Sequence, residues 1–77
     1  MTEPVTELIQ SRENLGLTQG QFASLIGVSR QTVIAWESGA SQPHGTSLRI
    51  LAATLLQSVP VVASWFEREP QAASGGK

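Results

Sequence analysis

A short run in the middle of the chain carries side chains that can recognise the edges of DNA bases. Arg30 and Gln31 are of the two types that form paired hydrogen bonds with bases, arginine with guanine and glutamine with adenine. Ile34 can contact the methyl group of a thymine, and Ala35 is small enough to let a helix lie close to the bases. With about 100° per residue, Gln31, Ile34 and Ala35 share one side of a helix. No carboxylate points outward from that side, so the pattern predicts a helix face suited to reading DNA.

The other side of the same helix is expected to face the core. Val33, Trp36 and Glu37 share this side at helical spacing. The helix is predicted to run from Arg30 to about Ser38, and Gly39 is expected to end it. One acidic residue, Glu37, therefore falls among apolar residues that are expected to be buried.

A second capped helix is expected immediately before this one. Thr18 and Gln21 have the spacing of a capping box, and Gly27-Val28-Ser29 reads as a three-residue turn whose serine caps the next helix. Two capped helices joined by a tight glycine turn, within residues 18–39, form a helix-turn-helix unit. In such a unit the second helix enters the major groove. The alternative interpretation is a helical hairpin in a small bundle that does not bind DNA.

Two charged residues are predicted to meet inside the protein. Arg12 interrupts the apolar stripe of the first helix, which also contains Val5, Leu8 and Leu15, and Glu37 lies on the core side of its own helix. A buried charge must be paired, so we expect Arg12 and Glu37 to form a salt bridge that orients the third helix against the first. Alternatively, both side chains reach the solvent from the edges of their stripes.

The whole chain is predicted to be all-α, with five short helices in one compact domain. Apolar residues recur at helical spacing, and alternation at period two is absent. We expect Thr2 to cap the first helix, with Pro4 in its first turn, and Pro60 to lie in the first turn of the fifth. The fourth helix is expected to bury Leu48, Leu51, Ala52, Leu55 and Leu56. The predicted helices are about Glu3–Leu15, a helix that begins after Thr18 and ends at Ile26, Arg30–Ser38, about Gly45–Gln57 and about Pro60–Arg68, in a domain of residues 1–69 followed by a disordered tail, residues 70–77.

Composition limits the classes of function. With 77 residues and 40% hydrophobic residues, the chain has room for one modest core. It has no cysteine and a single histidine, His44, so we expect no metal site and no cofactor. Paired carboxylates, a nucleophile–base pair and a phosphate loop are absent, which argues against an enzyme. Neither a signal peptide nor a membrane span is evident, so we expect a cytoplasmic protein.

The charge distribution is unusual for a protein that binds nucleic acid. The formal net charge is −1, whereas such domains are usually basic. However, five of the six acidic residues lie near the two ends of the sequence. Between Asn14 and Phe66 the only charged residues are Arg30, Glu37 and Arg49. The middle of the chain is therefore slightly positive.

The run from Leu15 to Pro43, LGLTQGQFASLIGVSRQTVIAWESGASQP, resembles the lambda-repressor-like, or Xre-type, helix-turn-helix family. The resemblance extends over about Leu8–Leu56. It is specific because many features coincide. These are Arg12, the GLTQ start, Phe22-Ala23, Ile26-Gly27-Val28-Ser29, Thr32-Val33 and Trp36-Glu37-x-Gly39.

This resemblance implies roles for individual residues. Gln19 would bind a phosphate and brace the recognition helix, while Arg12 and Glu37 match the salt bridge of the family. Arg30, Gln31, Ile34 and Ala35 would face the bases of double-stranded DNA, and Thr32, Ser38 and Gly39 would approach phosphates. Apart from the resemblance, Arg49 lies near the start of the fourth helix and either contacts the DNA backbone or is solvated. His44 could also contact a phosphate, but a solvated loop histidine is the simpler interpretation.

The stretch from Pro43 to Leu51 is similar to a subgroup that includes toxin–antitoxin regulators and small phage or prophage regulators, among them anti-CRISPR-associated repressors. Antitoxins of this subgroup usually add a segment that wraps a toxin. The short segments before the first helix and after the fifth favour a stand-alone autorepressor. An antitoxin-like protein that binds and neutralises a partner protein is the alternative function.

Apolar residues near the C-terminus exceed what one core contact needs. Exposed apolar surface of this kind often marks a partner site. We therefore expect a homodimer whose two recognition helices address the half-sites of an inverted-repeat operator. The alternative is that the fifth helix only caps the core. The predicted dimer residues are Ile50, Val61, Val62, Trp65 and Phe66.

Overall fold

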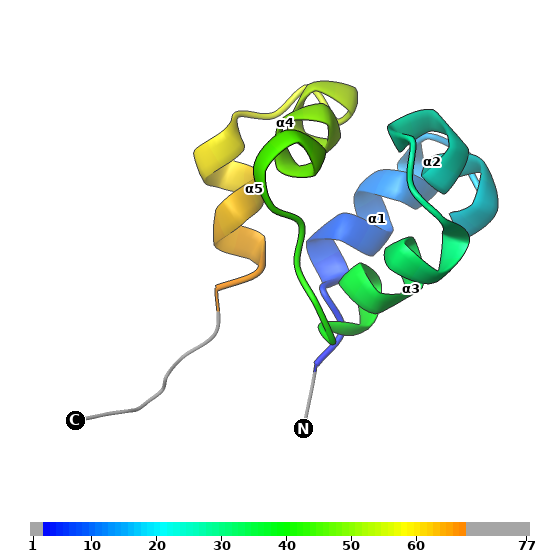
Figure 1. Cartoon of the computed structure of the whole chain (residues 1–77), viewed down its shortest axis with the longest axis horizontal. Helices are drawn as coiled ribbons and strands as arrows, with labels where there is room; N and C mark the ends of the chain where they lie inside the picture. The colour runs from blue at the N-terminus through cyan, green and yellow to red at the C-terminus, as the bar shows by residue number, and fades with distance from the viewer. Residues whose placement is uncertain (1–2, 68–77) are drawn as a thin grey trace.

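Five short helices make up residues 3–67, the part of the chain that the computed structural model describes (Figure 1). No strand occurs in this part, so the predicted all-α fold is confirmed. Helix α2 packs on α3, α4 packs on α5, and smaller contacts join α1 to α3 and α2 to α4. The helices are α1 (Thr6–Asn14), α2 (Gln19–Ile26), α3 (Arg30–Ser38), α4 (Gly45–Thr54) and α5 (Val59–Trp65).

Local capping interactions determine where α2 begins and ends and where α3 begins. The Thr18 hydroxyl accepts a hydrogen bond from the Gln21 amide, and the Gln21 side chain accepts one from the Thr18 amide, at 3.1 and 2.9 Å. The Ser29 hydroxyl likewise accepts from the amide of Thr32. Gly27, with φ of 92°, ends α2 in the left-handed conformation that glycine adopts without strain. The predicted boundaries of α2 and α3 are confirmed.

The first helix begins later than predicted. Val5 occupies the N-cap position of α1 and no side chain caps the helix, so Pro4 lies before the helix and not in its first turn. The cause is tertiary, because the Val5 amide donates a hydrogen bond of 2.8 Å to the Glu37 carbonyl oxygen and the Val5 side chain is buried. Thr2, the predicted cap, lies outside the described residues, as does the predicted tail, residues 70–77.

The turn between α4 and α5 also differs from the prediction. Helix α4 ends at Thr54, three residues early, and Leu56 has φ of 58°, the left-handed conformation in which helices usually place glycine. The Leu56 side chain was expected to be buried, but it is 91% exposed. Helix α5 starts at Val59, capped by the Ser58 hydroxyl, and it ends at Trp65 instead of Arg68.

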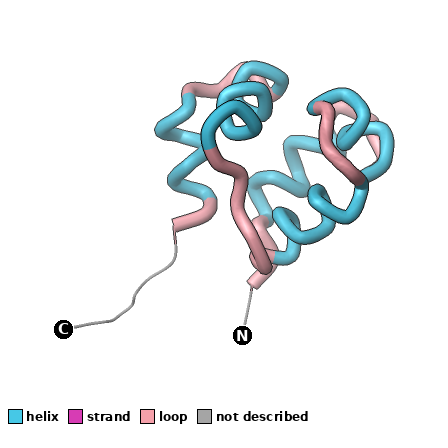
Figure 2. Tube along the Cα trace, viewed as in Figure 1, coloured by secondary structure: helices cyan, strands magenta, loops and turns pink. Residues whose placement is uncertain are grey.

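The core lies between all five helices. Leu48 and Leu55 are only partly buried against it, and Leu15, expected in the buried stripe of α1, is 48% exposed. The tube in Figure 2 shows that an extended segment connects the end of α3 to the start of α4, the longest connection between two helices of the described chain. The buried apolar residues are Val5, Leu8, Phe22, Ala23, Ile26, Val33, Trp36, Leu51, Ala52, Val62 and Phe66.

No single helix within residues 3–67 is long and apolar enough to cross a membrane. Only α4 and α5 taken together reach that length and hydropathy, and they are bent by 104° relative to each other. Leu51, Ala52 and Val62 of this pair are buried in the core of the domain.

The left-handed conformation of Leu56 predicts a stabilising substitution. At protein concentrations too low for self-association, Leu56→Gly should raise the free energy of unfolding by about 0.5 kcal/mol. The relief of backbone strain exceeds the entropic cost of glycine, and almost no packing is lost. Leu25→Gly is the matched control, because Leu25 is also exposed (58%) but lies within α2. That change should lower the stability by about 1 kcal/mol. Urea titrations measure both values. An equal loss of unfolding free energy in the two variants would contradict the prediction.

Candidate nucleic-acid interface

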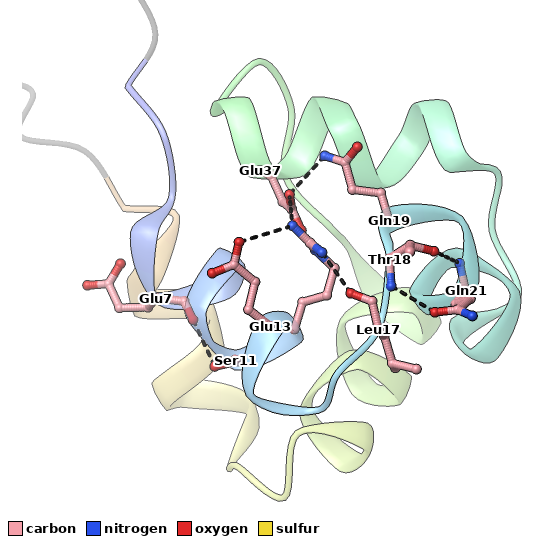
Figure 3. A network of polar contacts seen from close by, with 9 residues as sticks. Glu7, Ser11, Glu13, Leu17, Thr18, Gln19, Gln21 and Glu37 are labelled. Atoms are coloured by element: carbon pink, nitrogen blue, oxygen red, sulfur yellow. Dashed lines mark hydrogen bonds and ion pairs between the residues drawn. The ribbon is translucent and has the colours of Figure 1, made fainter.

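A buried carboxylate lies at the junction of the first three helices. The Glu37 carboxylate of α3 accepts hydrogen bonds from Arg12 of α1, at 2.6 Å from Nε and 3.4 Å from Nη2 (Figure 3). The two side chains are only 12% and 5% exposed. Because isolated buried charges are strongly unfavourable, the pairing is a condition for this packing. The structure thus brings together the two charged residues that the sequence placed on core-facing stripes.

The second helix contributes a third donor to the same carboxylate. Gln19, the first residue of α2, donates a hydrogen bond of 3.0 Å from Nε2 to Oε1 of Glu37. Figure 3 shows the Gln19 amide reaching from α2 toward Glu37. The side chain therefore braces α2 against α3. Its contact with a DNA phosphate stays a prediction.

Main-chain groups reinforce the same junction. Arg12 also donates from Nη1 to the Leu17 carbonyl oxygen at 2.8 Å, which ties α1 to the loop before α2. At the other end, the Glu37 carbonyl accepts from the Val5 amide. Glu37 is thus held through both its side chain and its backbone. The orientation of α3 relative to α1 and α2 follows from these contacts.

The outer face of α3 presents the residues predicted to contact bases. Arg30 and Gln31 are exposed, and neither side chain forms a hydrogen bond or ion pair with another described residue. Their donors and acceptors are therefore available to an external partner. Ile34 and Ala35 are half-buried, so only part of each side chain is accessible. Gln31, Ile34 and Ala35 lie on the side of α3 away from the buried Val33 and Trp36, whereas Arg30 is exposed at the first residue of the helix.

The hydroxyl groups predicted to approach phosphates already have local partners. Thr32 and Ser29 share a hydrogen bond of 2.9 Å between their hydroxyls, and the Ser38 hydroxyl donates to the Ala35 carbonyl at 3.1 Å. Gly39 ends α3 with φ of 83°. Since a hydroxyl has one donor and two acceptor sites, Ser38 would have to give up its present bond to donate to a phosphate oxygen. The phosphate roles of Thr32, Ser38 and Gly39 stay predictions.

Few charges lie near this face. Glu37 is paired with Arg12 and buried. The remaining charged residues between Asn14 and Phe66 are Arg30 and Arg49, and both are exposed. His44 is exposed at the N-cap of α4, and its side chain caps no amide there. Among residues 3–67, no group of three metal-ligating side chains is found. The chemistry available here is hydrogen bonding and contact with an anionic surface.

Comparison with known proteins agrees with this geometry. A family model described as helix-turn-helix matches residues 8–59, more than half of the chain. The chain belongs to the helix-turn-helix family, of the Xre or lambda-repressor-like type. The matched region contains the complete Arg12–Gln19–Glu37 network and all of α3.

Two relatives of this helix-turn-helix chain are informative. It is 36% identical over 45 residues to Antitoxin HigA-2 of Vibrio cholerae, covering 58% of this chain and 43% of that protein. It is 47% identical over 38 residues to an HTH-type transcriptional regulator of Methanothermobacter thermautotrophicus, covering 49% of this chain and 55% of that protein. The chain thus spans about half the length of the curated relatives it matches. No solved structure matches it significantly.

The residues predicted for a dimer interface divide into two groups in this helix-turn-helix domain. Val62 (0% exposed) and Phe66 (7%) belong to the core, so their assignment to an exposed interface was wrong, and Trp65 packs partly buried against the same core. Because α5 is short, Val62, Trp65 and Phe66 are the side chains with which it packs against the core. Ile50 and Val61 do remain exposed, at 38% and 43%. Sequence reasoning missed two further exposed apolar residues beside them in the chain, Leu56 and Val59.

The network predicts a large cost for removing its acid. Glu37→Ala should lower the free energy of unfolding by about 3 kcal/mol, because Arg12 would remain largely buried without its partner. The double variant Arg12→Met with Glu37→Leu should recover most of this loss, since it removes both charges. Glu13→Ala is the control, because Glu13 is 63% exposed and 3.9 Å from Arg12, and it should change stability by less than about 0.5 kcal/mol. Denaturant titrations giving equal losses for Glu37→Ala and Glu13→Ala would refute this account.

Proposed function

We propose that the protein is a sequence-specific DNA-binding transcriptional regulator that reads the major groove with α3. The observation that carries the proposal is the Arg12–Gln19–Glu37 junction. It holds α3 so that Val33, Trp36 and Glu37 face inward and the unpaired side chains of Arg30 and Gln31 stay exposed. Membership of the helix-turn-helix family and the likeness to a transcriptional regulator support the same function.

In this proposal the outer residues of α3 divide the recognition of one half-site. Arg30 pairs with the two acceptors of a guanine, Gln31 pairs with an adenine, and Ile34 contacts a thymine methyl group. Ala35 allows the helix to lie close to the bases. Phosphate contacts then fix the position of the domain on the duplex, from Gln19, Thr32, Ser38, the backbone at Gly39, and Arg49.

The protein would act as a dimeric autorepressor. Two copies related by a two-fold axis place their recognition helices about one turn of DNA apart, which matches an inverted repeat. The exposed apolar residues Ile50, Leu56, Val59 and Val61 supply the surface for this contact. An operator that overlaps a promoter would then exclude RNA polymerase when the dimer is bound.

A second function is favoured by the likeness to Antitoxin HigA-2. In that case the same domain would also bind and neutralise a partner protein, and DNA binding would serve to regulate the pair. The exposed apolar surface of α4 and α5 is then available to the partner protein. Both functions include DNA binding, so they are separated by a pull-down with the product of a neighbouring gene, which should be retained only in the second case.

Selection of bound sequences from a random DNA pool tests the first function. The parent should enrich an inverted repeat. Gln31→Ala should relax the preference at one position in each half-site, at a cost of about 1–3 kcal/mol of discrimination. Ser24→Ala, an exposed change on α2, should leave the selected sequence unchanged. Absence of any enriched sequence at moderate salt would contradict sequence-specific DNA binding and leave only the binding of a partner protein.

Salt dependence should be shallow. Arg30 and Arg49 are the cations of α2–α4 that are not engaged with a protein carboxylate, so a dimer should release few counterions. The slope of log K against log salt should be no steeper than about −4, and Arg49→Ala should reduce its magnitude by about 2 per dimer. Filter-binding titrations between low and moderate salt measure both values. A slope near −10 is incompatible with this picture.

The revised dimer surface makes its own prediction. Val61→Asp should convert a dimer to a monomer in sedimentation experiments, because it places a charge on each side of an apolar contact. Leu25→Asp is the control, since Leu25 is more exposed than Val61 but lies on α2, and it should leave the mass unchanged. A parent that sediments as a monomer, or a Val61→Asp variant that keeps the parent's mass, counts against the proposed surface.

A further inference from the structure

Gly20 lies beside the Cδ atom of Arg30. A methyl group at Gly20 would lie 3.7 Å from Cδ of Arg30, which is ordinary van der Waals contact. Gly20 is the second residue of α2 and Arg30 is the first residue of α3, so the contact joins the N-terminal ends of the two helices. The guanidinium of Arg30, by contrast, forms no hydrogen bond or ion pair within residues 3–67.

The backbone does not require glycine at this position. Gly20 lacks the positive φ that Gly16, Gly27, Gly39 and Gly45 have, and glycine is less favourable than alanine inside a helix. The space beside this position admits one methyl group at contact distance, so it calls for a small residue and not for glycine alone. That space is bordered by the aliphatic stem of Arg30.

We propose that Gly20 is a positioning residue for Arg30, setting the direction in which its guanidinium reaches the DNA. The inference rests on the proposed function of Arg30 in contacting a base. Because Gly20 has no side chain, the stem of Arg30 can lie against the first turn of α2, where a larger residue would displace it. A guanidinium directed in this way needs less ordering to make two parallel hydrogen bonds with guanine.

Two substitutions of Gly20 distinguish the effect of filling the space beside Arg30 from the effect of helix propensity. Gly20→Ala adds one methyl group at contact distance and makes the helix more favourable, so the course of Arg30 is kept. Gly20→Val adds two further methyl groups, which fill both staggered positions that a helix leaves open to them. These groups compete with the Arg30 stem for the same space. Melting curves establish that both variants fold.

The first measurement does not depend on DNA. In the free parent protein, NMR should show a nuclear Overhauser effect between the Hδ protons of Arg30 and the Hα protons of Gly20. In Gly20→Ala the effect should move to the methyl protons, which take the place of the glycine Hα that faces Arg30, and in Gly20→Val no effect between residue 20 and the Hδ protons should remain. Absence of the effect in the parent would overturn the proposal, whatever the protein binds.

The second measurement is base preference at the operator position that depends on Arg30. Arg30→Ala should lower the discrimination there by about tenfold, and Gly20→Val should have a similar effect while Gly20→Ala has little. The Gly20→Val, Arg30→Ala double variant should discriminate no worse than Arg30→Ala alone, because the first change acts through the second residue. If Gly20→Val keeps the preference, or if the two losses add, Gly20 does not position Arg30. If Arg30→Ala itself has no effect, the proposed base contact of Arg30 is wrong, and the NMR result still decides where its stem lies.

Discussion

The carboxylate of Glu37 determines how the first three helices are arranged. A buried carboxylate is unfavourable by several kcal/mol unless charges and donors surround it, and here Arg12 and Gln19 provide them from α1 and α2. Any packing of α3 that separates Glu37 from these donors leaves an ion without compensation. The network therefore contributes mainly to specificity, because it excludes alternative arrangements, while the apolar core provides most of the free energy of folding.

The same pairing decides what α3 presents to the outside. Because the helix repeats every 3.6 residues, directing Val33, Trp36 and Glu37 inward leaves Gln31 and Ile34 on the opposite side. It also removes the one acid between Asn14 and Phe66 from that surface. The remaining acids lie toward the ends of the chain, and salt screens exposed charges beyond about 8 Å under physiological conditions. A net charge of −1 is therefore compatible with a surface that approaches phosphates.

The parts of the fold that could be predicted are those specified by local interactions. The limits of α2 and α3 follow from Thr18, Gln21, Ser29 and the glycines after each helix, all of which act within a few residues. The start of α1 could not be predicted in this way, since Val5 leaves the helix to bond the carbonyl of Glu37, which is distant in sequence. The Arg12–Glu37 pair was nevertheless predictable, because two isolated charges on two apolar stripes have few other partners.

The spacing of apolar residues does not predict which of them are buried when most positions of a helix are apolar. In the seven residues of α5 the pattern is apolar on most sides, and only the packing against α4 shows that Val62 is core while Val61 is surface. At Leu56 the pattern predicts burial, but the chain turns in a left-handed conformation and directs the side chain into solvent. Two unfavourable features, backbone strain and an exposed leucine, thus coincide at one residue. A second subunit that covers this turn would bury the leucine and so offset the strain, which would place the proposed two-fold axis near the α4–α5 junction and not along the buried side of α5.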